Sequence, residues 1–215
     1  MCDEHTLSDA DAALAARGLT RRDFTVMGAA AVLASAVPRS AHAAQVSTLI
    51  QTGVEFQTAD GTVDPYFAYP ASGMYPAVIL WPDIAGLRPA KEELANRLAW
   101  EGFAVLAVNQ YYRSAPAPVM ETFSEWRTPE GRARLQPMIA QVTPDAVMRD
   151  ARAFVGFLDQ QAGVDTARGI GVHGYCMGGP IAVRSAAAAP DRIKAVASFH
   201  GGGLATDKPD SPHRL

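Results

Sequence analysis

Cysteine is scarce in this sequence: Cys2 and Cys176 are the two cysteines among 215 residues. This count excludes a disulfide framework of more than one bridge, and no Cys/His spacing is typical of a zinc site. Cys2 lies in a segment that we expect to be removed from the mature chain. The mature protein should therefore hold one free thiol, that of Cys176, and no disulfide.

An excess of charge of one sign is also lacking. The formal net charge is −3, so the composition does not indicate binding to nucleic acid or to anionic membranes. No internal repeat is present, which argues against a solenoid or a propeller. Apolar residues make up 48% of the chain, an ordinary share for a globular protein, and 215 residues suffice for one domain with a sizeable core.

The N-terminal apolar stretch 25–34 is too short to cross a bilayer. It follows Arg21-Arg22 and precedes the small-x-small sequence Ala41-His42-Ala43. This order is typical of a twin-arginine (Tat) export signal. We therefore expect a signal peptide over 1–43, the Tat machinery as a partner, a periplasmic or secreted location and no stable membrane anchor. The alternative is an uncleaved amphipathic or disordered N-terminal segment.

The remaining residues, 44–215, alternate between strand-like and helix-like segments. Continuous apolar runs such as 76–81 are typical of strands buried on both faces of a parallel sheet. The stretch 114–142 is irregular and indicates excursion helices over the sheet edge, a common place for a substrate lid. The pattern predicts one α/β domain with a mostly parallel central sheet and helices on both faces. The expected strands are 45–50, 54–57, 62–69, 76–81, 103–108, 169–173 and 194–199, and helices are expected to begin at Pro89, Thr143 and Met177.

The segment 170–183 has the layout of a strand, a sharp turn and a helix. Within it, Gly-Tyr-Cys-Met-Gly-Gly at 174–179 matches the G-x-S-x-G nucleophile elbow, with Cys176 in the place of serine. Glycines on both sides of Cys176 remove side chains that would clash where helix and strand meet. The start of the helix favours a thiolate, and the N–H of Met177 is an oxyanion donor. The alternative is a buried structural cysteine beside a glycine-rich turn.

These six residues resemble the nucleophile elbow of dienelactone hydrolases, a branch of the α/β-hydrolase superfamily with a cysteine nucleophile. Two further stretches are similar to that family. Pro-Asp-Ile-Ala-Gly at 82–86 resembles a loop that carries a functional carboxylate near the thiol, although the family has glutamate where this chain has Asp83. Tyr-Tyr-Arg-Ser-Ala-Pro at 111–116 resembles the family's Tyr-x-Arg-x-Ala-Pro. The resemblance implies an α/β-hydrolase fold.

The resemblance also implies roles for single residues. The N–H of Ile84 is the expected second oxyanion donor, beside that of Met177. Arg113 takes the position of an arginine that binds the substrate carboxylate, and Asp83 takes that of the carboxylate near the thiol. Two alternatives stay open: Asp83 can cap the following turn, and Arg113 can be a surface residue without a partner.

Several candidate residues directly follow expected strands. The carboxyl ends of parallel strands meet at one edge of a sheet, and sites form there. We therefore expect a substrate-binding rim at this edge, where His200 could reach the pocket. The rim residues are Asp83, Tyr112, Arg113, Cys176 and His200.

Acyl transfer by a cysteine needs a general base and an acid that orients the base. In α/β-hydrolases both follow the nucleophile in the chain. By the family pattern, we expect the chain to stop at Leu215 before the last strands, the acid and the histidine. A sheet that stops there is expected to expose an apolar edge.

The leading interpretation is a hydrolase of small carboxylic esters or lactones, of the dienelactone hydrolase type, whose shortened chain is inactive by itself. No metal or organic cofactor is expected. One alternative is a non-catalytic remnant that binds a small acid or a partner chain. Another is a thiol redox sensor, because an exposed thiolate is also oxidisable.

Overall fold

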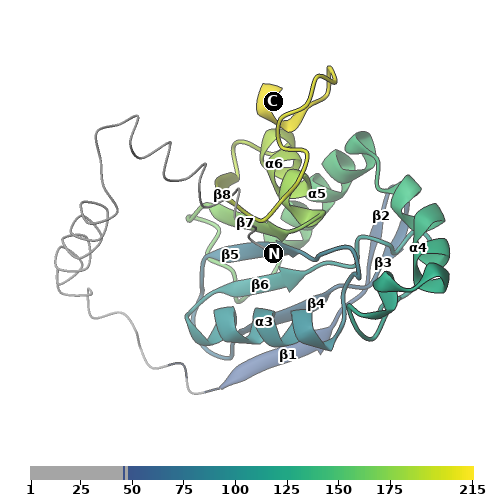
Figure 1. Ribbon diagram of the computed structural model, residues 1–215. Helices are drawn as coiled ribbons and strands as arrows, with labels where there is room; N and C mark the ends of the chain where they lie inside the picture. The colour runs from purple at the N-terminus through teal and green to yellow at the C-terminus, as the bar shows by residue number, and fades with distance from the viewer. Residues whose placement is uncertain (1–45, 47) are drawn as a thin grey trace, which may run out of the picture. The chain divides into compact units, whose positions relative to one another are not determined.

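The computed structural model describes residue 46 and residues 48–215; the expected signal peptide 1–43 and Cys2 lie outside the described residues. Within the described part of the chain, six strands form one sheet in the order β1-β4-β6-β5-β7-β8 (Figure 1). The pairs β6–β5, β5–β7 and β7–β8 are parallel, whereas β1 and β4 join antiparallel. The predicted mostly parallel sheet is thereby confirmed. Its strands are β1 (Leu49–Gly53), β4 (Tyr66–Pro70), β5 (Ala77–Trp81), β6 (Ala104–Ala107), β7 (Ile170–Tyr175) and β8 (Ile193–Phe199).

The strands that enter the sheet are antiparallel, but their boundaries differ from the predicted ones. The predicted strand 62–69 is in fact two strands, β3 (Gly61–Val63) and β4, and β3 pairs with β2 (Phe56–Thr58) in a separate hairpin. Pro65 separates them because it has no N–H for a sheet ladder. Its carbonyl instead accepts a hydrogen bond from the Val54 N–H (3.0 Å). The predicted break at Thr52-Gly53 is also wrong, since both residues continue β1.

Helices cover both faces of the sheet, as predicted. Ala95 and Ala99 of α3 pack with Leu80 in one hydrophobic cluster. Phe154 of α5 packs with Ile79 in another, to which α6 also contributes. Side chains alternate along a strand, so Ile79 and Leu80 point to opposite faces. The helices are α3 (Pro89–Trp100), α5 (Pro144–Leu158) and α6 (Gly178–Ala188).

The irregular stretch 114–142 contains η1 (Glu125–Arg127) and α4 (Pro129–Gln141), in agreement with the excursion helices expected there. Thr128 caps α4, because its hydroxyl accepts a hydrogen bond from the Gly131 N–H (2.9 Å). Leu135 packs with Ala85 and Tyr111 in a third cluster. α4 therefore lies against the loop that follows β5. A last short helix is η2 (Pro212–Arg214), and no helix among residues 48–215 has the length and apolarity to cross a membrane.

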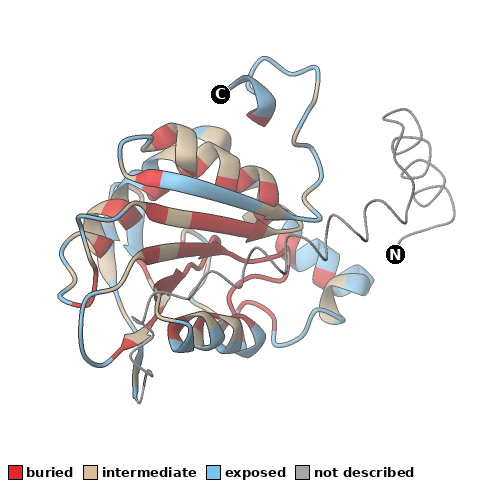
Figure 2. Ribbon diagram, turned by 90° about the vertical axis from the view of Figure 1, so that its left-hand side faces the viewer, coloured by how far each residue is buried: buried red, intermediate tan, exposed pale blue. Residues whose placement is uncertain are grey.

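β8 forms one edge of the described sheet (Figure 2). It pairs with β7 along its length, but most of its residues are exposed. Val196 and Phe199 have exposed fractions of 43% and 45%. In the described part of the chain, apolar side chains therefore face solvent at this edge.

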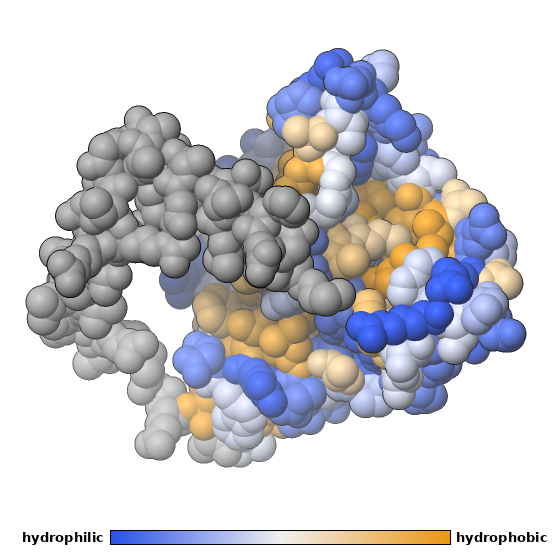
Figure 3. All heavy atoms as spheres, viewed as in Figure 1, coloured by the Kyte–Doolittle hydropathy of each residue, from blue (hydrophilic) through white to orange (hydrophobic). Residues whose placement is uncertain are grey.

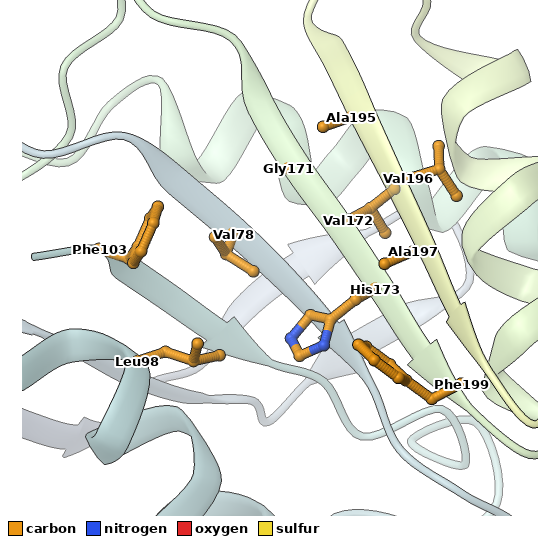
Figure 4. A pocket seen from close by; sticks show the side chains of 10 residues that line it. All are labelled: Val78, Leu98, Phe103, Gly171, Val172, His173, Ala195, Val196, Ala197 and Phe199. Carbon is orange, nitrogen blue, oxygen red and sulfur yellow. The ribbon is translucent and has the colours of Figure 1, made fainter. Parts of the chain in front are cut away.

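An apolar groove lies beside this edge, and the His173 ring projects into the group of side chains that line it (Figure 4). Leu98 and Phe199 are among them. His173 is buried, and its Nε2 has no hydrogen-bond partner among the described residues. Burial and, to a lesser degree, the charge of Lys91 lower the pKa of His173 from 6.5 to about 4. The folded protein therefore keeps this ring neutral.

The turn between β7 and α6 is packed backbone against backbone. A side-chain carbon on Gly174 would overlap the carbonyl group of Gly178. One on Gly178 would lie 2.5 Å from the carbonyl oxygen of Trp81, closer than carbon and oxygen approach in packed proteins. These two positions therefore accept only glycine, and α6 can start directly beside the ends of β5 and β7.

We predict that Gly174→Ala lowers the free energy of unfolding by about 3 kcal/mol or more, because the added methyl meets backbone that cannot rotate away. Gly156→Ala is the matched control. Gly156 lies inside α5 with no atom within 4 Å of an added carbon, so alanine should raise stability by up to about 1 kcal/mol. Urea unfolding measures both, and equal effects would contradict the packing argument.

The neutral His173 ring predicts a stability that depends on pH. Between about pH 4 and 6.5 the unfolded chain binds more protons at this residue than the folded one, so stability rises with pH over that window and is complete above it. The drop in unfolding free energy from pH 7 to pH 4 should be up to about 3 kcal/mol smaller in His173→Met than in the unchanged protein. Parallel pH curves for the two proteins would show that the ring titrates normally.

Candidate active site

Cys176 lies between β7 and α6, at the carboxyl end of the parallel strands. Its side chain is a free thiol and the residue is half-buried. Its backbone φ is 54°, in the left-handed region that residues other than glycine rarely adopt. The Cys176 N–H donates to the Phe199 carbonyl, and the Gly179 N–H donates to the Cys176 carbonyl, both at 3.0 Å. Strain of this kind clusters at functional sites, and the strand–turn–helix geometry is that of a nucleophile elbow.

Two backbone amides near Cys176 are available to a ligand. Among the described residues, neither the Met177 N–H nor the Ile84 N–H donates a hydrogen bond. Met177 precedes the first turn of α6, so its N–H is one of the unpaired donors at a helix start. Ile84 lies in the loop after β5, the strand beside β7. The sequence predicted these two amides as the oxyanion donors.

Tyr111 connects the two amide-bearing segments. Its hydroxyl donates to the Ile84 carbonyl (2.8 Å) and lies 3.9 Å from the Met177 sulfur. The side chain is buried. Burial raises the pKa of Tyr111, with smaller contributions from the negative charges of Asp83 and Cys176, so the hydroxyl stays protonated. Sequence reasoning missed this residue, although Tyr111 stands in the same Tyr-Tyr-Arg stretch as the predicted Tyr112.

Asp83 was predicted to lie near the thiol, but in the structure its carboxylate is taken up by the loop itself. It accepts hydrogen bonds from the Ala85 N–H (3.0 Å) and from both terminal nitrogens of Arg88 (2.9 and 3.0 Å), and pairs with Lys91 (2.8 Å). Burial acts to raise the pKa of Asp83, but these cations outweigh it and hold that pKa below its usual range. The geometry is that of the turn cap left open as the alternative.

Arg113 and Tyr112 were predicted to bind substrate, yet they belong to a partly buried ion network between the β2–β3 hairpin and α5. Arg113 donates to both oxygens of Asp150 (2.7 and 2.9 Å) and pairs with Asp60. The Tyr112 hydroxyl donates to Asp150 (2.8 Å) and also contacts Thr58 (2.8 Å). Only 11% of the Arg113 side chain is exposed. Its hydrogen-bonding capacity is thus used within the fold.

His200 directly follows β8 and is exposed, with a φ of 45°. Its ring centroid lies 6.3 Å from that of Tyr175. No hydrogen bond joins it to Cys176, and no other described residue donates to or accepts from the Cys176 sulfur. No group of three or more His, Cys, Asp or Glu residues within the described part of the chain could hold a metal ion. The described site therefore consists of a thiol, two amides and the tyrosine between them.

Comparison with known proteins gives a family match over most of the chain. The model of the dienelactone hydrolase family matches residues 63–214. The chain is 33% identical over 140 residues to a protein of Synechocystis sp. named "Putative carboxymethylenebutenolidase", a match that covers 65% of this chain and 54% of that protein. It is 32% identical over 127 residues to a carboxymethylenebutenolidase of Pseudomonas sp., covering 59% of this chain and 51% of the relative.

A solved structure has a similar fold. It is that of a dienelactone hydrolase-like promiscuous phosphotriesterase from metagenomic libraries, with a TM-score of 0.60 and 23% identity over 76% of this chain and 64% of the other. The chain spans about half the length of these two curated relatives. The family match covers more than half of the sequence and includes the Cys176 turn, the stretches 82–86 and 111–116, and β8. The chain belongs to the dienelactone hydrolase family.

Proposed function

We propose that this protein hydrolyses small carboxylic esters or lactones, with Cys176 as the nucleophile. The observation that supports this most is the backbone of Cys176, which occupies a positive-φ position between strand and helix. A structural cysteine needs no such conformation. A nucleophile gains from it, because the turn lifts the side chain to the sheet edge, where helix amides are unpaired.

The reaction proceeds in two steps. The Cys176 thiolate attacks the carbonyl carbon, and the oxyanion that forms lies against the N–H groups of Met177 and Ile84. The carbon–oxygen bond of the ester breaks, the leaving alkoxide takes up a proton, and a thioester on Cys176 remains. Water then adds to the thioester carbonyl and loses a proton to solvent, the carbon–sulfur bond breaks, the carboxylic acid leaves, and the thiolate of Cys176 is regenerated.

The two steps make unequal demands on the protein. Attack on an activated ester needs a sulfur nucleophile and an oxyanion site, and the described residues include a free thiol and two unpaired amides. Attack by water needs a general base, and no described residue contacts the sulfur in that role. We therefore expect the thioester to form faster than it is hydrolysed by this chain. Ligand binding without turnover is the second candidate function, favoured because no described residue contacts the Cys176 sulfur as a base.

The substrate class and the location are inferred from other observations. Two relatives are named for hydrolysis of a butenolide, a small unsaturated lactone that carries a carboxymethylene group, which supports a lactone as the substrate of this chain. The twin arginines and the small-x-small sequence before residue 44 support export through the Tat pathway to the periplasm or beyond.

We predict that p-nitrophenyl acetate releases close to one equivalent of p-nitrophenol in a burst, followed by a slower steady rate, because the thioester accumulates. Cys176→Ala should abolish the burst, and mass spectrometry should place the acetyl group on Cys176 in the unchanged protein. Cys2→Ala is the matched control and should leave the burst intact. A burst of equal size in both variants would reject Cys176 as the nucleophile.

A second prediction separates the two neighbouring tyrosines. Tyr111→Phe removes the hydrogen bond to the Ile84 carbonyl and should slow acylation about tenfold, since one oxyanion donor loses its support. Alkylation of the same thiol by iodoacetamide forms no oxyanion and should keep its rate. Tyr112→Phe should lower the unfolding free energy by about 1 kcal/mol through its lost bond to Asp150 and leave acylation within about twofold. Equal slowing of both reactions in Tyr111→Phe would indicate general distortion instead.

A further inference from the structure

A cavity of about 410 Å³ lies beside the candidate active site. Its volume falls within the ordinary range of small-molecule sites. Met177, whose amide is the expected oxyanion donor, contributes to its lining, and so does Ile181 in the first turns of α6. Ile139 of α4 and Val147 of α5 complete an apolar wall. Figure 3 shows hydrophobic residues gathered in a hollow between α4 and the C-terminal end of the chain.

Polar groups line the rest of the cavity, among them two cations, Arg184 and Lys208. Lys208 is exposed, whereas Arg184 is largely shielded from solvent. Arg184 lies four residues beyond Pro180 and three beyond Ile181, so the three share one face of α6. Side chains lean toward the N-terminus of a helix, which brings the guanidinium back toward the turn that holds Cys176. The Arg184 side chain is 13% exposed. Arg184 lies seven positions after Met177, about 10 Å along the helix axis at 1.5 Å per residue.

The partner that Arg184 has in the described part of the chain holds it weakly. Its guanidinium lies 3.4 Å from the carboxylate of Asp210, which is 49% exposed and sits on a loop. Charge-assisted bonds of this type are normally 2.7–2.9 Å long. Arg113, by contrast, donates to Asp150 at 2.7 and 2.9 Å. A ligand carboxylate can thus replace Asp210 at small cost, while one that approached Arg113 would meet Asp60 and Asp150.

We propose that Arg184, and not Arg113, binds the carboxylate of the substrate. The substrate class is then a small lactone or ester whose acid group lies a few bonds from the reacting carbonyl. The reacting carbonyl faces the amides of Met177 and Ile84, the apolar wall receives the carbon skeleton, and the Arg184 guanidinium pairs with the acid in bidentate fashion. This inference rests on the proposed function, because it places the acid relative to Cys176.

Two maleimide probes of matched size test the assignment without requiring turnover. The Cys176 thiol adds across the double bond of 6-maleimidohexanoic acid or of its neutral amide, with one carbon–sulfur bond formed and one proton taken up by the ring. Peptide mass spectrometry follows the modification of Cys176 alone. We expect the acid to react at least about fivefold faster than the amide in the unchanged protein, because a charged hydrogen bond adds to its binding.

Variants of the cation and of its weak partner define the outcome. Arg184→Gln should bring the acid-to-amide rate ratio to about 1, Arg184→Lys should leave an intermediate ratio, and Asp210→Asn should increase the ratio because a competitor is removed. Arg97→Gln is the matched control: Arg97 lies on α3, is largely exposed, and should keep the original ratio. Circular dichroism checks that each variant is folded. If Arg184→Gln does not fold, the ratio measured for Arg184→Lys decides the outcome.

The possible failures are distinguishable. An unchanged ratio in both Arg184 variants, or an equal loss in Arg97→Gln, would overturn the assignment to Arg184 and leave the nucleophile intact. A Cys176 thiol that reacts with neither probe would overturn the proposed function, and this inference with it.

Discussion

Contact between backbones at the turn that joins β7 to α6 is the constraint on which the site depends. Gly174 and Gly178 have no side chains, so the first turn of α6 lies against the carbonyl group of Trp81 at the end of β5. The helix therefore starts where two parallel strands end, and its unpaired amides collect at that edge. Cys176 is the residue between them, and its positive φ follows from the sharpness of the turn. The position of Cys176, its strained backbone and its closeness to unpaired amides thus all follow from the same close packing of backbones.

Charged side chains around this edge mainly hold loops in place. The loop after β5 carries Asp83 together with its own cation, Arg88, and the segment after β6 ties Arg113 to Asp60 and Asp150. Buried charges need such partners, because an unpaired one costs several kcal/mol. A side-chain charge that is already paired within the fold therefore binds a charged substrate group poorly. A negatively charged substrate group binds better to a cation whose carboxylate partner in the protein is exposed and lies beyond normal hydrogen-bond length.

The parts of the structure that local sterics determine could be predicted from the sequence, and the parts that depend on distant partners could not. The glycines around Cys176 and the apolar run of β5 carry their own structural requirements, so the turn and the mostly parallel sheet were predictable. Arg113 was assigned by resemblance to a substrate contact, whereas its partners Asp60 and Asp150 stand 53 and 37 residues away. Pro65 was a local signal that could have revealed the break between β3 and β4.

The edge strand β8 links the stability of the sheet to the backbone conformation of Cys176. The carbonyl of Phe199, at the end of β8, accepts the Cys176 N–H, and Gly201 beyond it lies close to Gly179. Most of β8 is exposed, and exposed edges are where local opening is least costly. Fraying of this strand would release the bond that holds Cys176 at its positive φ, so the residue could relax out of reach of the amides. Whatever pairs with or covers β8 would therefore also stabilise the positive φ of Cys176, so the order of this edge strand and the backbone conformation of Cys176 depend on each other.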